Sequence, residues 1–310
     1  MTDRHRSIRF GIFVILAALG LRAWAGRTEP PPQPNTAAVA VSTETGRKVR
    51  SLPSLVGYSP EYPPETAVPA LSADLRFEEG ELPELTNSAG LEADLTALLA
   101  APLRWDLREG AVLILSTHAT ESYTKEDEDY EESASFRTLD EGYNMLSIGD
   151  RVEELLAAAG ITVIRDRELH DHPSYNGSYA DARERLTALL EAHPETKLVL
   201  DLHRDAADGP DGRQYRPLAG DRAQLMVVLG SGFGHWQENL SLALKLCAQL
   251  ERQHPGITRP IQLRRATFNQ DLSPGALLIE VGAAGNTRPE ALRAAEELAQ
   301  AIIALSRGTV

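Results

Sequence analysis

The sequence of 310 residues contains one cysteine, Cys247. One thiol makes no intrachain disulfide and cannot build a cysteine-based zinc cluster, so any metal site must use histidine and carboxylate side chains. Aromatic residues are also scarce, at 5%, and any core must therefore be mostly aliphatic. We interpret Cys247 itself as a small, buried residue of a helix.

Positive charge is in the minority. The chain has 31 Lys and Arg against 45 Asp and Glu, which gives a formal net charge of -14. Non-specific binding to nucleic acid depends on Lys and Arg side chains that neutralise phosphates. The composition therefore argues against a nucleic-acid partner.

The amino terminus has the layout of an export signal. Arg4, Arg6 and Arg9 precede an apolar run at 10–21, and small residues follow at an Ala-x-Ala spacing. We predict that residues 1–25 are a signal peptide or a membrane anchor, because the run is shorter than the roughly 20 residues of a full span. Both alternatives place the rest of the chain outside the cytoplasm, either anchored to the cell membrane or secreted to the cell-wall space.

Two regions follow this segment. Residues 26–86 are rich in proline and polar residues, which predicts a disordered extracytoplasmic linker. From residue 87 to 310, short aliphatic runs alternate with segments of helical periodicity, and Ala111–Ser116, Lys197–Leu202 and Ala276–Val281 are the clearest strands. The alternation predicts a single α/β domain with a mostly parallel sheet and helices on both faces.

Four reactive side chains fall at the ends of these predicted strands. His118 lies two residues past the strand at 111–116, His203 directly follows the strand at 197–202, and Glu280 is near the end of the strand at 276–281. Parallel sheets bind ligands beyond the carboxyl ends of their strands, so these residues should share one rim. Glu121, three residues after His118, can point to the same place. Two histidines and a carboxylate form a catalytic zinc set, and we assign Glu280 as the acid/base.

Other assignments at this rim stay open. His170 or His172, in the loop after a short predicted strand at 161–164, could bind the metal instead of Glu121. Asp201 or Asp205, on either side of the second histidine ligand, could orient its ring. The tyrosines that follow in this loop could line a substrate groove.

Glu280 also has a plainer interpretation, as the partner of Arg204 or Arg264 in an ion pair. Two other functions compete with a zinc hydrolase that uses Glu280 as its acid/base. The same metal ligands would also suit a secreted zinc carboxypeptidase-like peptidase, in which Arg204 or Arg264 would hold the terminal carboxylate of the substrate. A binding or complex-organising protein with an inactive site is the other alternative.

At these residues the chain resembles the stage II sporulation protein P family of cell-wall hydrolases. The resemblance covers about residues 88–306. Where the family usually has a histidine two residues before His118, this chain has Ser116. The matching segments are Thr117–Tyr123, His170–Tyr179, Asp201–Ala206, Asn269–Gly275 and Ile279–Gly282.

The resemblance implies a branch of the zinc N-acetylmuramoyl-L-alanine amidases that also has endopeptidase activity on peptidoglycan. It implies Zn²⁺ on His118, Glu121 and His203, with Glu280 as the catalytic acid/base. It further implies an N-terminal membrane anchor, a role in septal wall thinning during engulfment, and a complex with stage II sporulation proteins D and M.

Overall fold

The computed structural model describes residues 77, 79–103, 107, 109–125, 136–207, 209 and 214–307. The predicted signal or anchor segment at 1–25 and most of the predicted linker at 26–86 lie outside these residues. Among the helices that the structure does describe, none combines the length and the apolar character needed to cross a bilayer.

A seven-stranded sheet forms the centre of the fold, in the order β1-β8-β7-β9-β4-β2-β3. All neighbouring strands are parallel except β7 and β9, which are antiparallel. This arrangement confirms the predicted mostly parallel sheet. The strands are β1 (Leu85–Asn87), β2 (Ala111–Leu115), β3 (Thr162–Arg165), β4 (Thr196–Asp205), β7 (Leu225–Gly230), β8 (Ile261–Arg264) and β9 (Ala276–Ala283), and β5 (Leu218–Ala219) and β6 (Arg222–Ala223) form a separate hairpin.

The antiparallel pair divides the sheet into two blocks that run in opposite directions. β9, β4, β2 and β3 point one way, and β7, β8 and β1 point the other way. One rim therefore combines the carboxyl ends of β2, β4 and β9 with the amino ends of β7 and β8. His118, His203 and Glu280 belong to this rim, whereas Arg264 ends β8 on the opposite rim.

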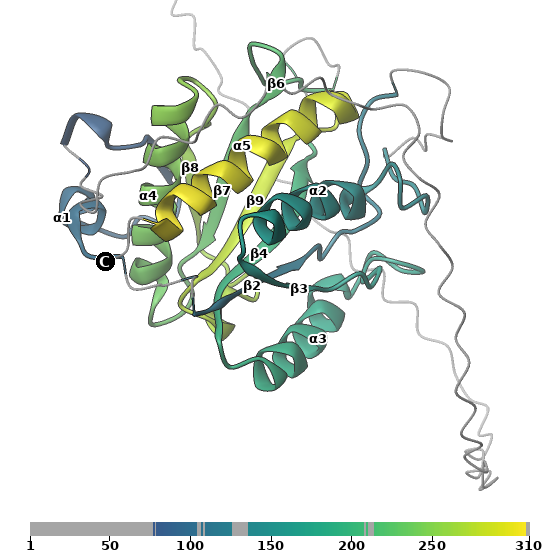
Figure 1. The fold of residues 1–310 in the computed structure, drawn as a ribbon, viewed down its shortest axis with the longest axis horizontal. Coiled ribbons are helices and arrows are strands. Elements are labelled where there is room, and N and C mark those ends of the chain that lie inside the picture. The colour runs from purple at the N-terminus through teal and green to yellow at the C-terminus, as the bar shows by residue number, and fades with distance from the viewer. Residues whose placement is uncertain are drawn as a thin grey trace, which may run out of the picture. The chain divides into compact units, whose positions relative to one another are not determined.

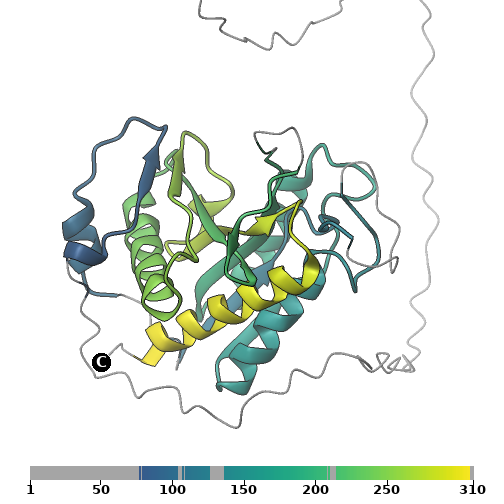
Figure 2. The same ribbon diagram turned by 90° about the horizontal axis from the view of Figure 1, so that it is seen from above.

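Helices cover both faces of the sheet, as predicted. Figure 1 shows α2, α4 and α5 beside one another across the strands, and the turned view in Figure 2 places α2 and α5 on one side of them. Their aliphatic side chains form the main core together with α1, whereas α3 packs against the other face in a smaller cluster. The helices are α1 (Leu95–Ala100), α2 (Met145–Ala158), α3 (Ser178–Ala192), α4 (Trp236–Gln253) and α5 (Arg288–Arg307), with short 3₁₀ turns η1 (Glu79–Glu81) and η2 (Gln270–Leu272).

The starts of α2 and α5 follow local sequence signals. Asn144 caps α2, because its side chain accepts a hydrogen bond from the backbone N–H of Leu146 at 2.9 Å. At the start of α5, Thr287 and Glu290 have the spacing of a capping box, and the Glu290 carboxylate accepts from the Thr287 N–H at 3.0 Å. Both signals can be read directly from the sequence.

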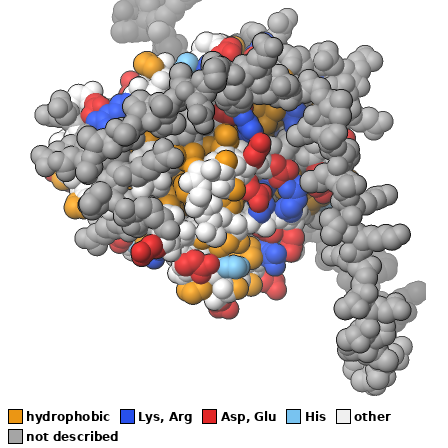
Figure 3. All heavy atoms as spheres, viewed as in Figure 1, with side chains coloured by type: hydrophobic (Ala, Val, Ile, Leu, Met, Phe, Trp, Pro, Cys, Tyr) orange, Lys and Arg blue, Asp and Glu red, His pale blue; other side chains and the backbone are white. Residues whose placement is uncertain are grey.

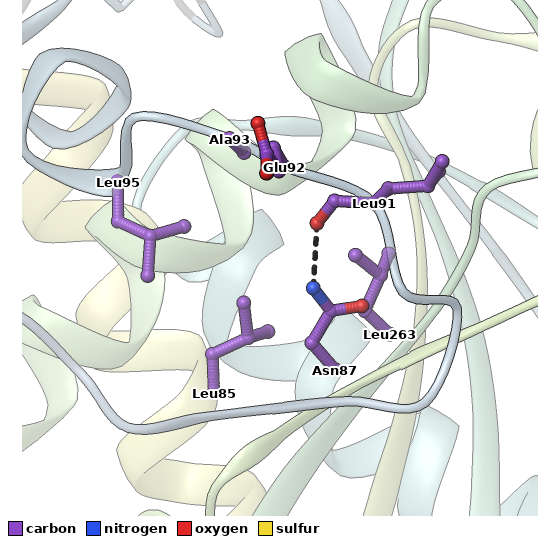
Figure 4. Close-up of a pocket in the computed structure, with 7 residues that line it drawn as sticks. All are labelled: Leu85, Asn87, Leu91, Glu92, Ala93, Leu95 and Leu263. Carbon is purple, nitrogen blue, oxygen red and sulfur yellow. Dashed lines mark hydrogen bonds between the residues drawn. The ribbon is translucent and has the colours of Figure 1, made fainter.

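The ordered fold begins before residue 87. β1 pairs with β8 from Leu85 onward, and Phe77 and Leu82 pack against the main core. A pocket of about 290 Å³ lies at this edge of the sheet, between β1 and the segment that leads into α1 (Figure 4). Asn87 and Leu91 both line it, and Asn87 Nδ2 donates a hydrogen bond to the Leu91 carbonyl oxygen at 2.6 Å. None of the candidate site residues lines this pocket.

The surface of the main helical layer carries mixed charge. Acidic and basic side chains lie next to one another on the face seen in Figure 3. Ion pairs account for part of this pattern, such as Arg151 of α2 with Glu296 of α5 at 2.9 Å. The negative net charge is thus locally neutralised where these helices meet.

Candidate active site

His203 and Glu280 are direct neighbours on adjacent strands. They are register partners in the parallel pair of β4 and β9. Leu202, Ile279 and Val281 belong to the core beneath the main helical layer. Because strand side chains alternate between faces, His203 and Glu280 point together to the face that α3 covers.

His118 approaches them from the turn after β2. Its ring centroid lies 5.1 Å from that of His203, with the two rings nearly perpendicular. Both imidazoles are buried. Ser178, the first residue of α3, places its Oγ 3.3 Å from His118 Nδ1. The first residue of α3 thus contacts the ring that the β2 turn presents.

Glu121 completes the predicted group. Its Oε2 lies 3.7 Å from His203 Nδ1 and accepts a hydrogen bond from the Arg204 backbone N–H at 3.1 Å. Its Oε1 lies 3.2 Å from Arg137 Nη2. The structure therefore brings His118, Glu121, His203 and Glu280 into one buried cluster, as the strand-end argument required.

Asp201 contacts His203 from the same strand. Its carboxylate accepts from the Thr117 N–H at 2.8 Å and from the Thr117 hydroxyl at 2.7 Å. Its Oδ1 also lies 3.0 Å from His203 Nε2, in a close ionic contact that lacks hydrogen-bond alignment. Asp205 instead pairs with Arg259 at 2.7 Å. Of the two aspartates proposed to orient His203, Asp201 is the one in contact.

The electrostatics give these groups different protonation states. Burial, together with the nearby His203, lowers the pKa of His118 to about 4. Burial opposes the charge of His203 as well, but the Asp201 and Glu121 carboxylates raise its pKa to about 9. Burial raises the pKa of Glu280 to about 8, against the opposing effect of His203. His118 is thus a neutral imidazole with a lone pair available, and Glu280 exchanges its proton near neutral pH.

The donor chemistry of this cluster fits zinc. Glu280 Oε2 is buried without a hydrogen-bond partner, which is typical of a catalytic group or of a position next to an ion or water. Imidazole nitrogens and a carboxylate oxygen are the ligands that zinc prefers. In the described part of the chain, however, no three His, Cys, Asp or Glu side chains have their donor atoms grouped as a metal site in this arrangement. The ligand assignment remains a prediction.

The two alternative ligands lie elsewhere. His170 is buried, and its Nε2 lies 2.8 Å from Asp166 Oδ2, which engages that nitrogen away from the cluster. His172 is exposed to solvent. Neither is seen in contact with His118 or His203, so the geometry favours Glu121 over both.

Aromatic rings form one wall of the cluster. Tyr175 stacks on His118 with ring centroids 4.5 Å apart, and it is 54% exposed, so it lies at the surface of the site. Tyr179 meets His118 edge-on at 5.4 Å and lies parallel to His203 at 6.4 Å. Phe268 follows at 6.1 Å from Tyr179. The segment predicted to line a groove therefore places two rings directly beside the histidines, Tyr175 from the loop and Tyr179 from the first turn of α3.

The arginines proposed for the competing hypotheses are placed differently. Arg204 is buried, and its guanidinium donates to the carbonyl oxygens of Ser122 and Phe136, each at 2.9 Å. Arg264 is exposed on the opposite rim. Neither forms an ion pair with Glu280 among the described residues, although Arg204 Nη1 lies 4.0 Å from Glu121 Oε1.

One residue of the site had no signal in the sequence. Arg137 contacts Glu121, Asp171 and Thr120 with its side chain and lies over the ring of Tyr175. It belongs to a stretch with neither helical nor strand periodicity, and no motif marks it. Only the folded chain shows that it reaches the cluster.

Comparison with known proteins agrees with the motifs. The family model of Stage II sporulation protein P (SpoIIP) matches residues 66–303, which is well over half of the chain. Stage II sporulation protein P of Bacillus subtilis (strain 168) is 26% identical over 208 residues, which cover 61% of this chain and 49% of that protein. The chain thus spans about half the length of this curated relative.

Solved structures with a similar chain course include two amidases. N-acetylmuramoyl-L-alanine amidase AmiC2 of Nostoc punctiforme is 16% identical, with a TM-score of 0.39, and the match covers 62% of this chain and 94% of that chain. N-acetylmuramyl-L-alanine amidase Ami1 of Mycobacterium smegmatis is 15% identical, with a TM-score of 0.40 and coverage of 65% and 99%. From the extent of the family match, together with the motifs around the cluster, we conclude that the chain belongs to the stage II sporulation protein P family.

Proposed function

We propose that this protein is a peptidoglycan hydrolase, namely a zinc-dependent N-acetylmuramoyl-L-alanine amidase with additional endopeptidase activity, which thins the septal wall during engulfment in sporulation. Family membership supports the biological process. The observation that carries the chemistry is the unpartnered Oε2 of Glu280, which sits on the strand beside His203 and on the same face. A purely structural carboxylate in this position would have a partner.

The residues divide the proposed reaction among them. His118, Glu121 and His203 would hold the zinc ion, which when bound polarises the scissile carbonyl and lowers the pKa of a water. Glu280 takes a proton from the attacking water on Oε2 and returns it to the leaving amide nitrogen. The net result is one water added across the amide, which frees a carboxyl group on the glycan side and an amine on the stem peptide.

The surrounding groups prepare these four side chains. Asp201 is fixed by two hydrogen bonds from Thr117, so it holds a negative charge against one edge of the His203 ring. This contact leaves Nδ1 of His203 on the side of Glu121, at 3.7 Å from its Oε2. Tyr175 and Tyr179 shield the other ring, that of His118, from part of the solvent. Partial exclusion of water strengthens the electrostatic contacts of the cluster.

Location and partners extend the same proposal. The expected signal or anchor at residues 1–25 would deliver the domain to the outside of the cytoplasmic membrane, where peptidoglycan is found. Stage II sporulation proteins D and M are the proposed partners there.

The test is product analysis with the purified full chain. The protein is loaded with zinc and incubated with purified sacculi and with defined muropeptides, and the products are identified by mass. An amidase releases intact stem peptides with a free amino-terminal alanine, and an endopeptidase splits cross-linked peptides. Release of single amino acids from peptide ends would instead support the carboxypeptidase hypothesis.

Variants connect the products to the cluster. We expect His118→Ala and His203→Ala to abolish product release and zinc binding. His193→Ala is the matched control, because His193 follows α3 at the amino end of β4, on the rim opposite the cluster. If both site variants digest sacculi as fast as the parent, the proposed mechanism is wrong.

A further inference from the structure

Arg137 joins two separate segments at the edge of the cluster. Its Nη1 donates to Asp171 Oδ2 at 2.5 Å and to the Thr120 hydroxyl at 3.1 Å, and its Nη2 donates to Glu121 Oε1 at 3.2 Å. Thr120 and Glu121 belong to the turn at 117–121, and Asp171 belongs to the loop at 170–175. One guanidinium therefore connects the turn at 117–121, which carries the proposed ligands His118 and Glu121, to the loop at 170–175.

The Asp171 carboxylate strengthens this connection through its own contacts with Thr120. It is buried, and its carboxylate accepts from the Thr120 hydroxyl at 2.5 Å and from the Thr120 N–H at 3.2 Å. A buried carboxylate without a cation is costly, and Arg137 supplies the cation. Asp171 and Arg137 thus form a single clamp, which we call the 137–171 clamp, around Thr120.

The clamp also reaches the first ligand. The Arg137 guanidinium carbon lies 4.6 Å from the centre of the Tyr175 ring, and that ring stacks on His118 at 4.5 Å. The backbone repeats the connection, because Thr138 N donates to Thr120 O at 2.8 Å and Arg137 forms an isolated bridge with Glu121. Side-chain and backbone contacts therefore fix Arg137 relative to both His118 and Glu121.

We infer that Arg137 is a positioning residue that fixes the Glu121 carboxylate and the His118 ring for zinc through the 137–171 clamp. The inference rests on the proposed zinc enzyme and adds a residue to it. Groups that hydrogen-bond to metal ligands orient them, and their loss typically weakens metal binding about 10- to 100-fold. Arg137 does not contact the reacting atoms in this account; it acts through the ligands.

The shape of the side chain is essential to this role. Arginine presents a planar fork that serves Asp171, Thr120 and Glu121 at the same time, whereas the ammonium of lysine is a compact point charge. Arg137→Lys should therefore keep the charge but lose the simultaneous contacts. We expect the zinc dissociation constant of this variant to rise about 10- to 100-fold.

The measurement is zinc affinity of the full chain in the absence of substrate, by competition with a chromogenic chelator. Arg151→Lys is the matched control. Arg151 also bridges two carboxylates, Glu154 and Glu296, and its side chain is 17% exposed against 23% for Arg137, but it lies on the α2–α5 surface. The control should bind zinc like the parent. Added guanidinium ion should partly restore the zinc affinity of Arg137→Ala, which a general loss of folding would not allow.

A second variant protects the test against poor folding of the first. Asp171→Asn keeps the size of the side chain and removes the charge that Arg137 meets. The double variant combines Asp171→Asn with Arg137→Lys. If the clamp acts as a unit, this double variant should bind zinc no more weakly than whichever single variant binds zinc more weakly. Additive losses would show that the two residues act separately and would overturn the clamp.

The outcomes separate this inference from the proposed function. If the parent binds one zinc and Arg137→Lys binds it equally tightly, the positioning role is wrong and the zinc enzyme stands. If the parent binds no zinc at all, the proposed function fails, and this inference fails with it.

Discussion

Replacement of Glu280 by glutamine should separate activity from stability. The substitution keeps the shape of the side chain and removes its ability to take up a proton. Acid/base catalysis by a positioned side chain typically contributes 10²- to 10⁴-fold, so we expect kcat for muropeptide cleavage to fall by about that factor.

The stability effect should have the opposite sign or be absent. Glu280 Oε2 is buried without a hydrogen-bond partner, so the substitution breaks no bond to that atom. Glu121 and Asp205 also lie near enough to repel its charge. Glutamine stays neutral in both the folded and the unfolded chain, so it avoids the cost of burying a carboxylate, which we take as about 1–3 kcal/mol. For a domain of this size, each kcal/mol corresponds to a shift in Tm of about 2–4 °C. We therefore expect an unchanged or higher Tm in the presence of a chelator.

Glu290, in α5, is the matched control for Glu280. Glu290 is also buried, but its carboxylate is fully engaged with Arg216, with Asn286 Nδ2 at 3.0 Å and with the Thr287 N–H at 3.0 Å. Glu290→Gln should lower Tm, because charge-assisted bonds contribute about 1.5–3 kcal/mol each, and should leave kcat near that of the parent. The two substitutions thus move stability and activity in opposite ways.

The assay combines thermal unfolding of the metal-free proteins with mass-resolved cleavage rates of the zinc-loaded ones. A Glu280→Gln variant that cleaves at the parental rate would refute the acid/base role. A marked fall in its Tm would show that Glu280 has a structural partner and would refute the argument from its unpaired oxygen.

Further perturbations test the metal, the backbone, one buried charge and the edge strand. Removal of zinc with a chelator should abolish cleavage, and added zinc should restore it in the parent but not in His203→Ala; restoration in that variant would exclude His203 as a ligand. Gly275→Ala should destabilise the fold by about 1–3 kcal/mol in urea unfolding, because the added Cβ would meet the Lys197 carbonyl oxygen at 2.1 Å; an unchanged midpoint would contradict this contact. Burial lowers the pKa of Lys245 from 10.5 to about 8, so the unfolded chain binds the extra proton between these values and stability should rise with pH across them by at most about 3 kcal/mol. Lys245→Met should lose that rise, and an identical pH profile in both proteins would refute the burial cost. A chain that begins after β1 should unfold at a lower temperature than one that keeps Leu85, and equal Tm values would show that β1 adds nothing to the sheet.

Local pattern was enough to predict six strands of the sheet, the main helices and the rim that carries the site, but not β1, β5 or β6. Hydrophobic runs identify strands wherever they lie in the chain, and His118, His203 and Glu280 each fall at the end of such a run. The shared direction of β2, β4 and β9 then places all three at one edge. The reversal of β7 also has a signal in the sequence. Among its described residues, the connection from β4 to β7 contains no helix to carry the chain back across the sheet, and parallel strands of one sheet need such a crossover.

The chemical environment of these residues was decided by the tertiary structure. The sequence places Asp201 and Asp205 equally close to His203, and only the folded chain shows that Thr117 holds Asp201 against the ring while Arg259 takes Asp205. In the same way, the pattern offered no reason to single out Arg137, which reaches Asp171 across 34 positions of the chain. Periodicity reports which side of an element is buried. It carries no information about which distant polar groups meet there, because those contacts depend on how the loops beyond the strand ends pack against one another.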